Sequence, residues 1–467
     1  MSDKTKADIG IIGAGIGGLT AGALLTKKGY RVAIFEKEPL IGGRAISFYP
    51  SNFTLEEYKK LLSRFHMNIA FSEPDLETIF EKNMLEGYKL DLGYHAIGGG
   101  AISNINSVLS ELDRHVVMLE SYIGFIKENG YDFPFLSRSD KIKILPKMLR
   151  LLFSGERTMK QLDAVSMTET INKYGKDKMK LILEVFSRAI TTINNLDRIS
   201  TGETFRSQKN LLRGSKPVGY PEKGLSSICQ TLADFIIQNG GEINLDKPVQ
   251  KIIVKKNKAT GIAVDDKEYF FKSIISNILV QNLFTLVNEK CFPSDYVKNI
   301  KSLTGTGSLC AYYSLEKVDP NLASKCFFFI ERDAGLDGGD AVGMIDFMTA
   351  SSSGLAPLSH HLIQSYIICT PEEAKNKKIL DNLKELLDKN LERLIPDFYS
   401  QLRWALYPAV WHLDGVAKTI DNIKPEIKTP VDNLYLVGDC VKAPGIGINC
   451  ALNSAQMLKD FLAQETP

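Results

Sequence analysis

The chain has 467 residues, enough for two or three domains that share substantial cores. Hydrophobic residues make up 44% of the sequence and charged residues 24%, which is the usual balance of a globular protein. The formal net charge is only +2. Because binding to nucleic acid through its phosphates needs a concentrated basic face, this balance excludes nucleic acid as an expected partner.

Cysteine and histidine usage excludes further classes. The seven cysteines lie far apart and form no Cys-x-x-Cys pair, so we expect neither a disulfide framework nor an iron–sulfur cluster. With only six histidines, no metal site is predicted. No apolar run reaches the roughly 18 residues of a membrane-spanning helix. The first eight residues lack a signal-peptide core, which predicts a cytoplasmic protein.

The first predicted element is a short apolar strand over residues 8–12, which runs into a glycine-rich turn. A helix is predicted from Ile16 to Lys28, where Gly29 ends it, and a second strand covers residues 31–36. A strand, a helix and a strand at this spacing form a compact βαβ unit.

The turn of this unit carries the strongest motif, a GxGxxG pattern made of Gly13, Ala14, Gly15, Ile16, Gly17 and Gly18. Its first glycine permits a tight turn, its second lets the main chain approach a pyrophosphate, and its third lets the helix pack closely on the sheet. Free N–H groups at the helix N-terminus would meet the anion. Glu36 follows 23 residues after Gly13, close to the ~20 expected for an acid that binds the adenosine ribose. Its charge would repel a 2′-phosphate, which disfavours NADP.

The rest of the chain alternates between two patterns. Residues 50–224 carry helical periodicity with charged faces, which predicts an inserted, mainly helical region. Strands and a helix return after residue 225, and residues 305–370 alternate like an antiparallel sheet. A charged helix is predicted over 371–393, and the last strand over 433–439.

These elements predict an α/β fold: a Rossmann-type dinucleotide-binding domain with an inserted substrate domain of antiparallel sheet plus helices. The dinucleotide-binding domain is predicted to contain residues 1–70, 225–300 and 405–467. The substrate domain is predicted to contain residues 71–224 and 301–404.

Two further glycine motifs extend the first one. One directly follows Glu36, and the other ends the last strand and begins the last helix; their residues are Gly42, Gly43, Arg44, Gly438, Asp439, Gly447, Ile448 and Asn449. In this order the three motifs resemble the flavin amine oxidase superfamily and, within it, the phytoene desaturase-like group of carotenoid desaturases, carotene isomerases and retinol saturases. The segments 220–225 and 240–249 are similar to that group as well, while the central region is not specific.

The resemblance implies FAD as the cofactor, held by the three motifs together with Glu36, Lys37 and the main chain at Val249. It also implies hydride transfer between a substrate carbon and flavin N5. The candidate catalytic residues are Tyr94 and His95, because a histidine two residues after the Asp-Leu-Gly of 91–93 is similar to the retinol-saturase branch. His95 would exchange a proton near neutral pH. A hydrogen-bonded structural role for His95 and a packing role for Tyr94 are the alternatives.

The function implied is that of an FAD-dependent oxidoreductase that desaturates, saturates or isomerises carbon–carbon bonds of a hydrophobic isoprenoid or polyene. Its electron acceptor or donor is not identified. One alternative is a flavin amine oxidase, for which Trp404, Tyr407 and Trp411 are the candidate aromatic residues. Another is an FAD-containing protein that binds lipid without catalysis. Cys440 and Cys450 flank the last glycine motif and are interpreted as small buried residues.

Residues 140–153 place four basic side chains among eight apolar ones. Such a basic amphipathic segment is typical of helices that lie on anionic bilayers, which predicts peripheral contact with the cytoplasmic face of a membrane. A cap helix of the substrate domain, solvated on one side, is the alternative.

Overall fold

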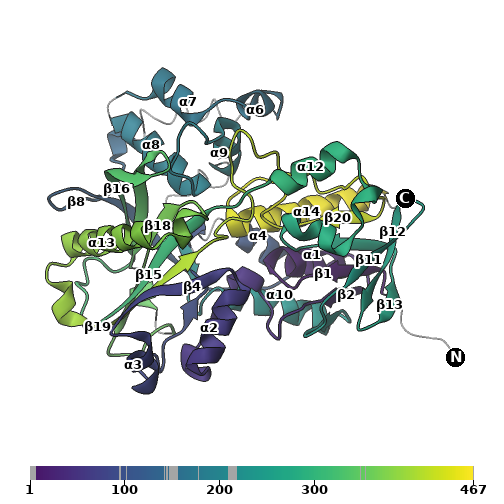
Figure 1. The fold of residues 1–467 in the computed structure, drawn as a ribbon, viewed down its shortest axis with the longest axis horizontal. Helices are drawn as coiled ribbons and strands as arrows, with labels where there is room; N and C mark the ends of the chain where they lie inside the picture. The colour runs from purple at the N-terminus through teal and green to yellow at the C-terminus, as the bar shows by residue number, and fades with distance from the viewer. Residues whose placement is uncertain are drawn as a thin grey trace.

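The computed structural model describes residues 7–93, 96–100, 103–140, 142, 146, 156–176, 178–208, 218–347, 349–352 and 354–465. Two parts lie side by side (Figure 1). One contains a five-stranded parallel sheet, and the other contains a ten-stranded sheet with four helices at one end.

The parallel sheet is the first part's centre. Its strands, in spatial order, are β10 (Glu242–Asn244), β2 (Val32–Phe35), β1 (Ile9–Ile12), β14 (Ser273–Ser276) and β20 (Leu434–Leu436). The three central strands are almost wholly apolar and buried, as strands covered on both faces must be. Three helices pack beside them: α1 (Ile16–Lys27), α10 (Ser226–Gln238) and α14 (Gly447–Glu465). A small antiparallel sheet completes this part, with β11 (Lys251–Lys255), β12 (Lys258–Val264) and β13 (Lys267–Phe270).

The second part is built on the larger sheet. Its strand order is β4 (Met67–Glu73), β19 (Leu402–Val410), β15 (Gly307–Leu315), β18 (His361–Cys369), β17 (Gly339–Asp346), β16 (Lys325–Leu336), β7 (Met118–Ile126), β9 (Val218–Pro221) and β6 (Ile97–Gly98), with β8 (Tyr131–Asp132) paired to β7. Neighbouring strands are antiparallel except β16 and β7, which are parallel.

Side chains of this sheet alternate between two faces. Phe327 and Phe329 point into a core with helix α13 (Lys377–Leu394), which covers one face. Phe328, between them, belongs to the core that the sheet shares with the parallel-sheet part. Because side chains alternate, one face of the sheet packs on helix α13 and the other face points towards the parallel-sheet part.

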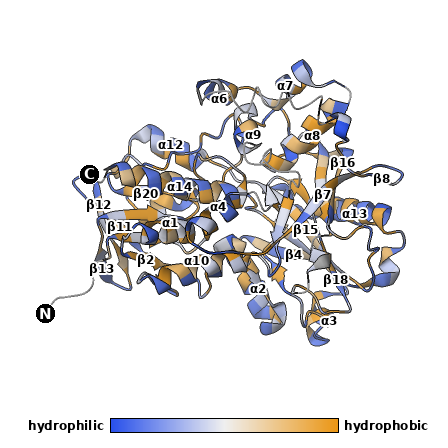
Figure 2. Ribbon diagram, turned by 180° about the vertical axis from the view of Figure 1, so that it is seen from behind, coloured by the Kyte–Doolittle hydropathy of each residue, from blue (hydrophilic) through white to orange (hydrophobic). Residues whose placement is uncertain are grey.

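Four helices close the chamber from the other side: α6 (Glu156–Leu162), α7 (Met167–Tyr174), α8 (Lys178–Thr191) and α9 (Thr201–Gln208). Figure 2 shows orange and blue on opposite sides of α8, so its apolar stripe turns inward. Shorter elements connect the two parts, namely β3 (Ser47–Phe48), α2 (Leu55–Arg64), α3 (Leu76–Glu81), β5 (Leu90–Asp91), α4 (Asn104–Glu111), α11 (Leu283–Leu286) and α12 (Ser294–Ser302).

The architecture matches the predicted class, and two details differ. Residues 50–224 contribute five strands of the large sheet besides their helices. The sequence does not reveal them, because β7 and its neighbours are short or two-sided and carry little alternation. Strand β19 lies wholly in the large sheet, although the sequence division placed its residues from 405 onward in the other domain. Most of the segment 140–153 lies outside the described residues, so its membrane contact stays a prediction. In the described part of the chain, no helix is both long and apolar enough to cross a membrane.

Candidate functional site

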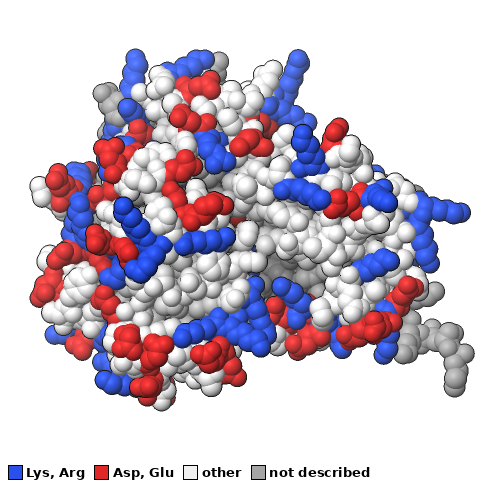
Figure 3. Space-filling model, viewed as in Figure 1, with Lys and Arg blue, Asp and Glu red and all other residues white. Residues whose placement is uncertain are grey.

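A cavity of about 1550 Å³ runs between the two parts. It is larger than the ~300–1,000 Å³ that one small ligand fills, so it has room for a cofactor and a substrate together. One end is lined by the glycine motifs, and the other end by the large sheet and the cap helices. Figure 3 shows the molecular surface hollowed between the two parts, with basic side chains along one rim.

The first glycine motif forms a cradle that has no space for side chains. Gly13 has a φ of +95°, a conformation that L side chains rarely adopt, directly after strand β1. A Cβ on Gly17 would lie 2.5 Å from the Asn277 side chain and 3.1 Å from the main chain of Gly438. Helix α1 starts after Gly15, with no side-chain cap and no acidic residue in its first turn. Its first N–H groups are therefore free to bind an anion.

The second glycine motif lies directly beside the first. The Gly42 N–H donates a 2.7 Å hydrogen bond to the Ala14 carbonyl, and Gly42 has a φ of +110°. A Cβ on Gly43 would lie 3.3 Å from the Cα of Gly15. The two glycine turns lie more than 20 residues apart in the sequence, yet their main chains are in contact. Together they form one surface of exposed main chain, which can bind an extended dinucleotide.

Glu36 directly follows strand β2 and lines the cavity. One carboxylate oxygen accepts a 2.6 Å hydrogen bond from the Ala14 N–H and the other a 3.0 Å bond from the Glu38 N–H. Burial raises the pKa of Glu36, and the two main-chain donors oppose that change. The carboxylate is therefore fixed in position at the end where the adenosine ribose is expected.

Arg44 and Asp439 join the second and third motifs. Arg44 donates to the Asp439 carboxylate at 2.7 Å and to the carbonyls of His412 and Leu413. The other oxygen of Asp439 accepts from the Gly415 N–H at 2.8 Å. Burial opposes ionisation of Asp439, but the Arg44 guanidinium outweighs it and holds the pKa of Asp439 below its ordinary value.

The third motif closes the cavity with the N-terminus of helix α14. The side-chain amide N–H of Asn449 donates to the Gly98 carbonyl at 2.8 Å. The side-chain oxygen of Asn449, Oδ1, is buried without a partner among the described residues. An orphaned buried acceptor costs free energy, so a ligand donor is expected there. Cys440 and Cys450 are buried free thiols, as predicted.

Most of the predicted cofactor residues line this cavity. The exceptions are Ala14, whose N–H binds Glu36, and Gly18, where a Cβ would lie 2.1 Å from the Gly13 carbonyl oxygen. The glycine cradle, the free helix N-terminus and the orphaned Asn449 acceptor all fit FAD. Direct contact of each residue with FAD stays a prediction, and Tyr94 and His95 lie outside the described residues.

The far end of the cavity is an apolar chamber. Its wall comes from strands β7, β16, β17 and β18 and from helices α8 and α9, with the lining residues Ile123, Phe135, Leu136, Met179, Ile182, Leu183, Phe186, Ala189, Ile190, Phe205, Phe328, Met344 and Tyr366. Polar groups are a minority of this lining; they include the hydroxyls of Thr170, Thr192 and Thr201, and the Asp414 carboxylate where the chamber meets the glycine motifs. Such a wall binds through apolar surface rather than through charge.

The sequence did not identify the chamber or Asp414. Chamber residues come from strands and helices that are far apart in the sequence, so no local motif marks them. The aromatic residues considered for an amine oxidase lie elsewhere: Trp404 packs on Tyr88, Tyr407 binds Asp388, and Trp411 donates to the Ala374 carbonyl. None of the three is among the described residues that line the cavity.

Comparison with known proteins agrees with this geometry. The family model for flavin containing amine oxidoreductases matches residues 16–457. The chain belongs to this family. It is 24% identical to a 1-hydroxycarotenoid 3,4-desaturase of Flavobacterium sp. (97% of this chain, 98% of that protein) and 23% identical to a chloroplastic prolycopene isomerase of Arabidopsis thaliana (94% and 81%). An oxidoreductase structure from Methanosarcina mazei matches with a TM-score of 0.71 at 22% identity, over 97% of this chain and 99% of that one. The protein is an FAD-dependent oxidoreductase.

Proposed function

We propose that this enzyme oxidises, reduces or isomerises carbon–carbon bonds of a long, apolar polyene. The observation that carries the proposal is the chamber: an apolar wall continuous with the dinucleotide cradle, with few polar side chains. A charged amine substrate would need charged partners in the chamber, and the described wall offers hydroxyl groups but no carboxylate except Asp414 at its border with the cradle. Two of the relatives named above are carotenoid enzymes by their names, which supports the same substrate class.

The bound flavin supplies hydride transfer at N5. The protein's own contribution is positional. The glycine cradle and the Arg44–Asp439 pair fix the nucleotide, and the Asn449 acceptor holds one further ligand donor. Side chains such as Phe186 and Phe328 align an extended chain and exclude water from the reacting carbons.

The test uses the FAD-loaded protein with phytoene and with prolycopene, each in detergent micelles and without oxygen, in the oxidised and in the reduced form. Chromatography of the extracted polyenes measures conversion. We expect one of the two to lose or gain hydrogen or to change double-bond geometry. A parallel assay with putrescine is run in the presence of oxygen. Conversion of putrescine with peroxide release, together with no conversion of either polyene, would contradict the proposal.

A further inference from the structure

Four carboxylates line the cavity among the described residues: Glu36, Glu38, Asp414 and Asp439. Glu36 and Asp439 are held by main-chain N–H groups and Arg44, and Glu38 is held by Arg64 and Lys37. Every oxygen of these three side chains therefore has a described partner. The exception in the set is Oδ1 of Asp414, because among the residues that the structure describes only Oδ2 of Asp414 has a hydrogen-bond partner.

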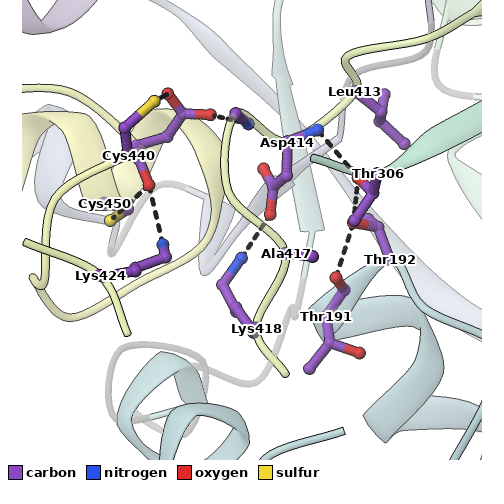
Figure 4. Close-up of polar contacts among 12 residues, drawn as sticks. Thr191, Thr192, Thr306, Leu413, Asp414, Ala417, Lys418, Lys424, Cys440 and Cys450 are labelled. Atoms are coloured by element: carbon purple, nitrogen blue, oxygen red, sulfur yellow. Dashed lines mark hydrogen bonds and ion pairs between the residues drawn. The ribbon is translucent and has the colours of Figure 1, made fainter. Parts of the chain in front are cut away.

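The partner of Oδ2 is Lys418, four residues further along the chain. The Lys418 ammonium binds Asp414 directly, and the two side chains are only 1% and 6% exposed (Figure 4). A buried ammonium needs a carboxylate partner, so the pair fixes the Asp414 side chain and leaves its other oxygen available.

Three separate segments hold the turn that carries this pair. The Asp414 N–H donates to the Thr306 hydroxyl at 3.0 Å, and the Thr306 N–H donates to the Asp414 carbonyl at 3.1 Å. The Thr306 hydroxyl lies 2.9 Å from that of Thr192, which also lines the cavity. The Lys418 carbonyl accepts from the Ser200 N–H at 3.0 Å. The carboxylate is therefore held in place before any ligand binds.

Asp414 lies where the nucleotide cradle meets the chamber. Its Oδ1 is 3.8 Å from the position of a Cβ on Gly447, the first residue of helix α14. The next residue, Gly415, donates to Asp439 of the cradle. Thr192 and Tyr366 of the chamber line the same cavity. A ligand that extends from the cradle into the chamber would thus pass close to Oδ1.

We propose that Asp414 is the proton-transfer residue of this enzyme and that Lys418 is the residue that positions it, an inference that rests on the function proposed above. In desaturation, a hydride leaves one carbon with both bonding electrons and reduces FAD. A proton leaves the neighbouring carbon for Oδ1 of Asp414, and the electrons of that C–H bond form the new double bond. In saturation the same carboxyl group delivers the proton.

The first measurement is polyene conversion by FAD-loaded Asp414→Asn. We expect conversion to fall by about 100-fold, within the range for loss of a general acid or base, while the dissociation constant for FAD stays within about threefold. Asp414→Glu should restore part of the conversion. Conversion by Asp414→Asn close to wild type would overturn the proposal, and so would a large loss of FAD affinity, because Asp414 would then be a flavin ligand.

The second measurement is the midpoint potential of the bound FAD, which needs no substrate. Asp414→Asn removes a negative charge beside the flavin and should raise the potential, Lys418→Met should lower it, and Lys418→Arg should restore it. Asp388→Asn is the matched control, since Asp388 is also buried and pairs with a lysine four residues away, Lys384, but does not line the cavity. It should leave the potential unchanged.

Further variants distinguish a folding defect from a failure of the proposed function and from a failure of the role proposed for Asp414. Asp414→Asn leaves Lys418 unpaired, so the double variant Asp414→Asn with Lys418→Met removes both charges and should fold while conversion stays lost. A wild-type enzyme that converts neither polyene would overturn the proposed function alone. In that case the potential decides: an unshifted potential in Asp414→Asn would overturn a role for Asp414 at the flavin.

Discussion

The two ends of the cavity are built by different means. The nucleotide end is made of main chain: Gly15, Gly17 and Gly43 line it, and a Cβ on any of them would lie 3.3 Å or less from a neighbouring atom. The chamber end is made of side chains, such as Phe186 and Phe328, carried by elements far apart in the sequence. A shared cofactor can be bound by backbone geometry that tolerates no substitution, while the substrate is selected by side chains that can change one at a time.

The largest effect should come from filling the cradle. Gly17→Val places methyl groups against Asn277 and the main chain of Gly438, both of which form its wall. FAD affinity should fall by at least about 100-fold, roughly 3 kcal/mol, measured by quenching of flavin fluorescence. Gly354→Val is the control, because a Cβ there would meet nothing closer than 3.8 Å. Equal affinities in the two variants would show that the cradle does not hold the cofactor.

The second-largest effect should come from breaking the ion pair between Arg44 of the second motif and Asp439 of the third. Arg44→Met leaves Asp439 buried without its cation, and we expect a loss of about 2–3 kcal/mol in the unfolding free energy of the FAD-free protein. Chemical denaturation measures this loss. Lys377→Met removes an exposed pair with Asp381 and should cost less than about 0.5 kcal/mol. If both variants lose a similar amount of unfolding free energy, the Arg44–Asp439 pair stabilises the protein no more than an exposed ion pair does.

A smaller, selective effect is expected in the chamber. Ala189→Trp fills space beside the cap helices, and polyene conversion should fall about tenfold while FAD affinity stays unchanged. Lys180→Trp lies on the same helix, α8, but its position is 60% exposed, so it should have no effect. A loss of FAD binding in Ala189→Trp would remove the distinction between the two ends.

The same contrast explains what the sequence could predict. The cradle was predictable because glycine spacing determines main-chain geometry locally, so Gly13 to Gly18 and Glu36 could be placed before any fold was known. Asp414 could not, since a lone carboxylate after a strand has no local signature. Its significance depends on Lys418, Thr306 and the N-terminus of α14, which only the tertiary fold brings together. The strands within 50–224 were missed for a similar reason, because their pairing with distant strands outweighs weak local alternation.

The smallest effect concerns pH and two histidines beside the cradle. The rings of His66 and His412 lie 4.8 Å apart, close to Arg44. Burial, with the neighbouring His66, Arg44 and Lys375, lowers the pKa of His412 from 6.5 to about 4. The folded state therefore binds fewer protons than the unfolded chain between these values, so stability rises with pH across this window. The contribution is complete above pH 6.5 and is lost as the pH falls towards 4.

His412→Asn removes this proton uptake without adding a charge. Thermal unfolding of the variant should depend less on pH between 6.5 and 4 than that of the wild type. His361→Asn, at the start of strand β18 and away from the cluster, should keep the wild-type dependence. Because FAD brings negative phosphates to the same cavity, bound FAD should make protonation of His412 less unfavourable and flatten the wild-type curve. If FAD leaves the wild-type curve unchanged, the pyrophosphate does not lie near Arg44 and His412, and the nucleotide end would need a different arrangement.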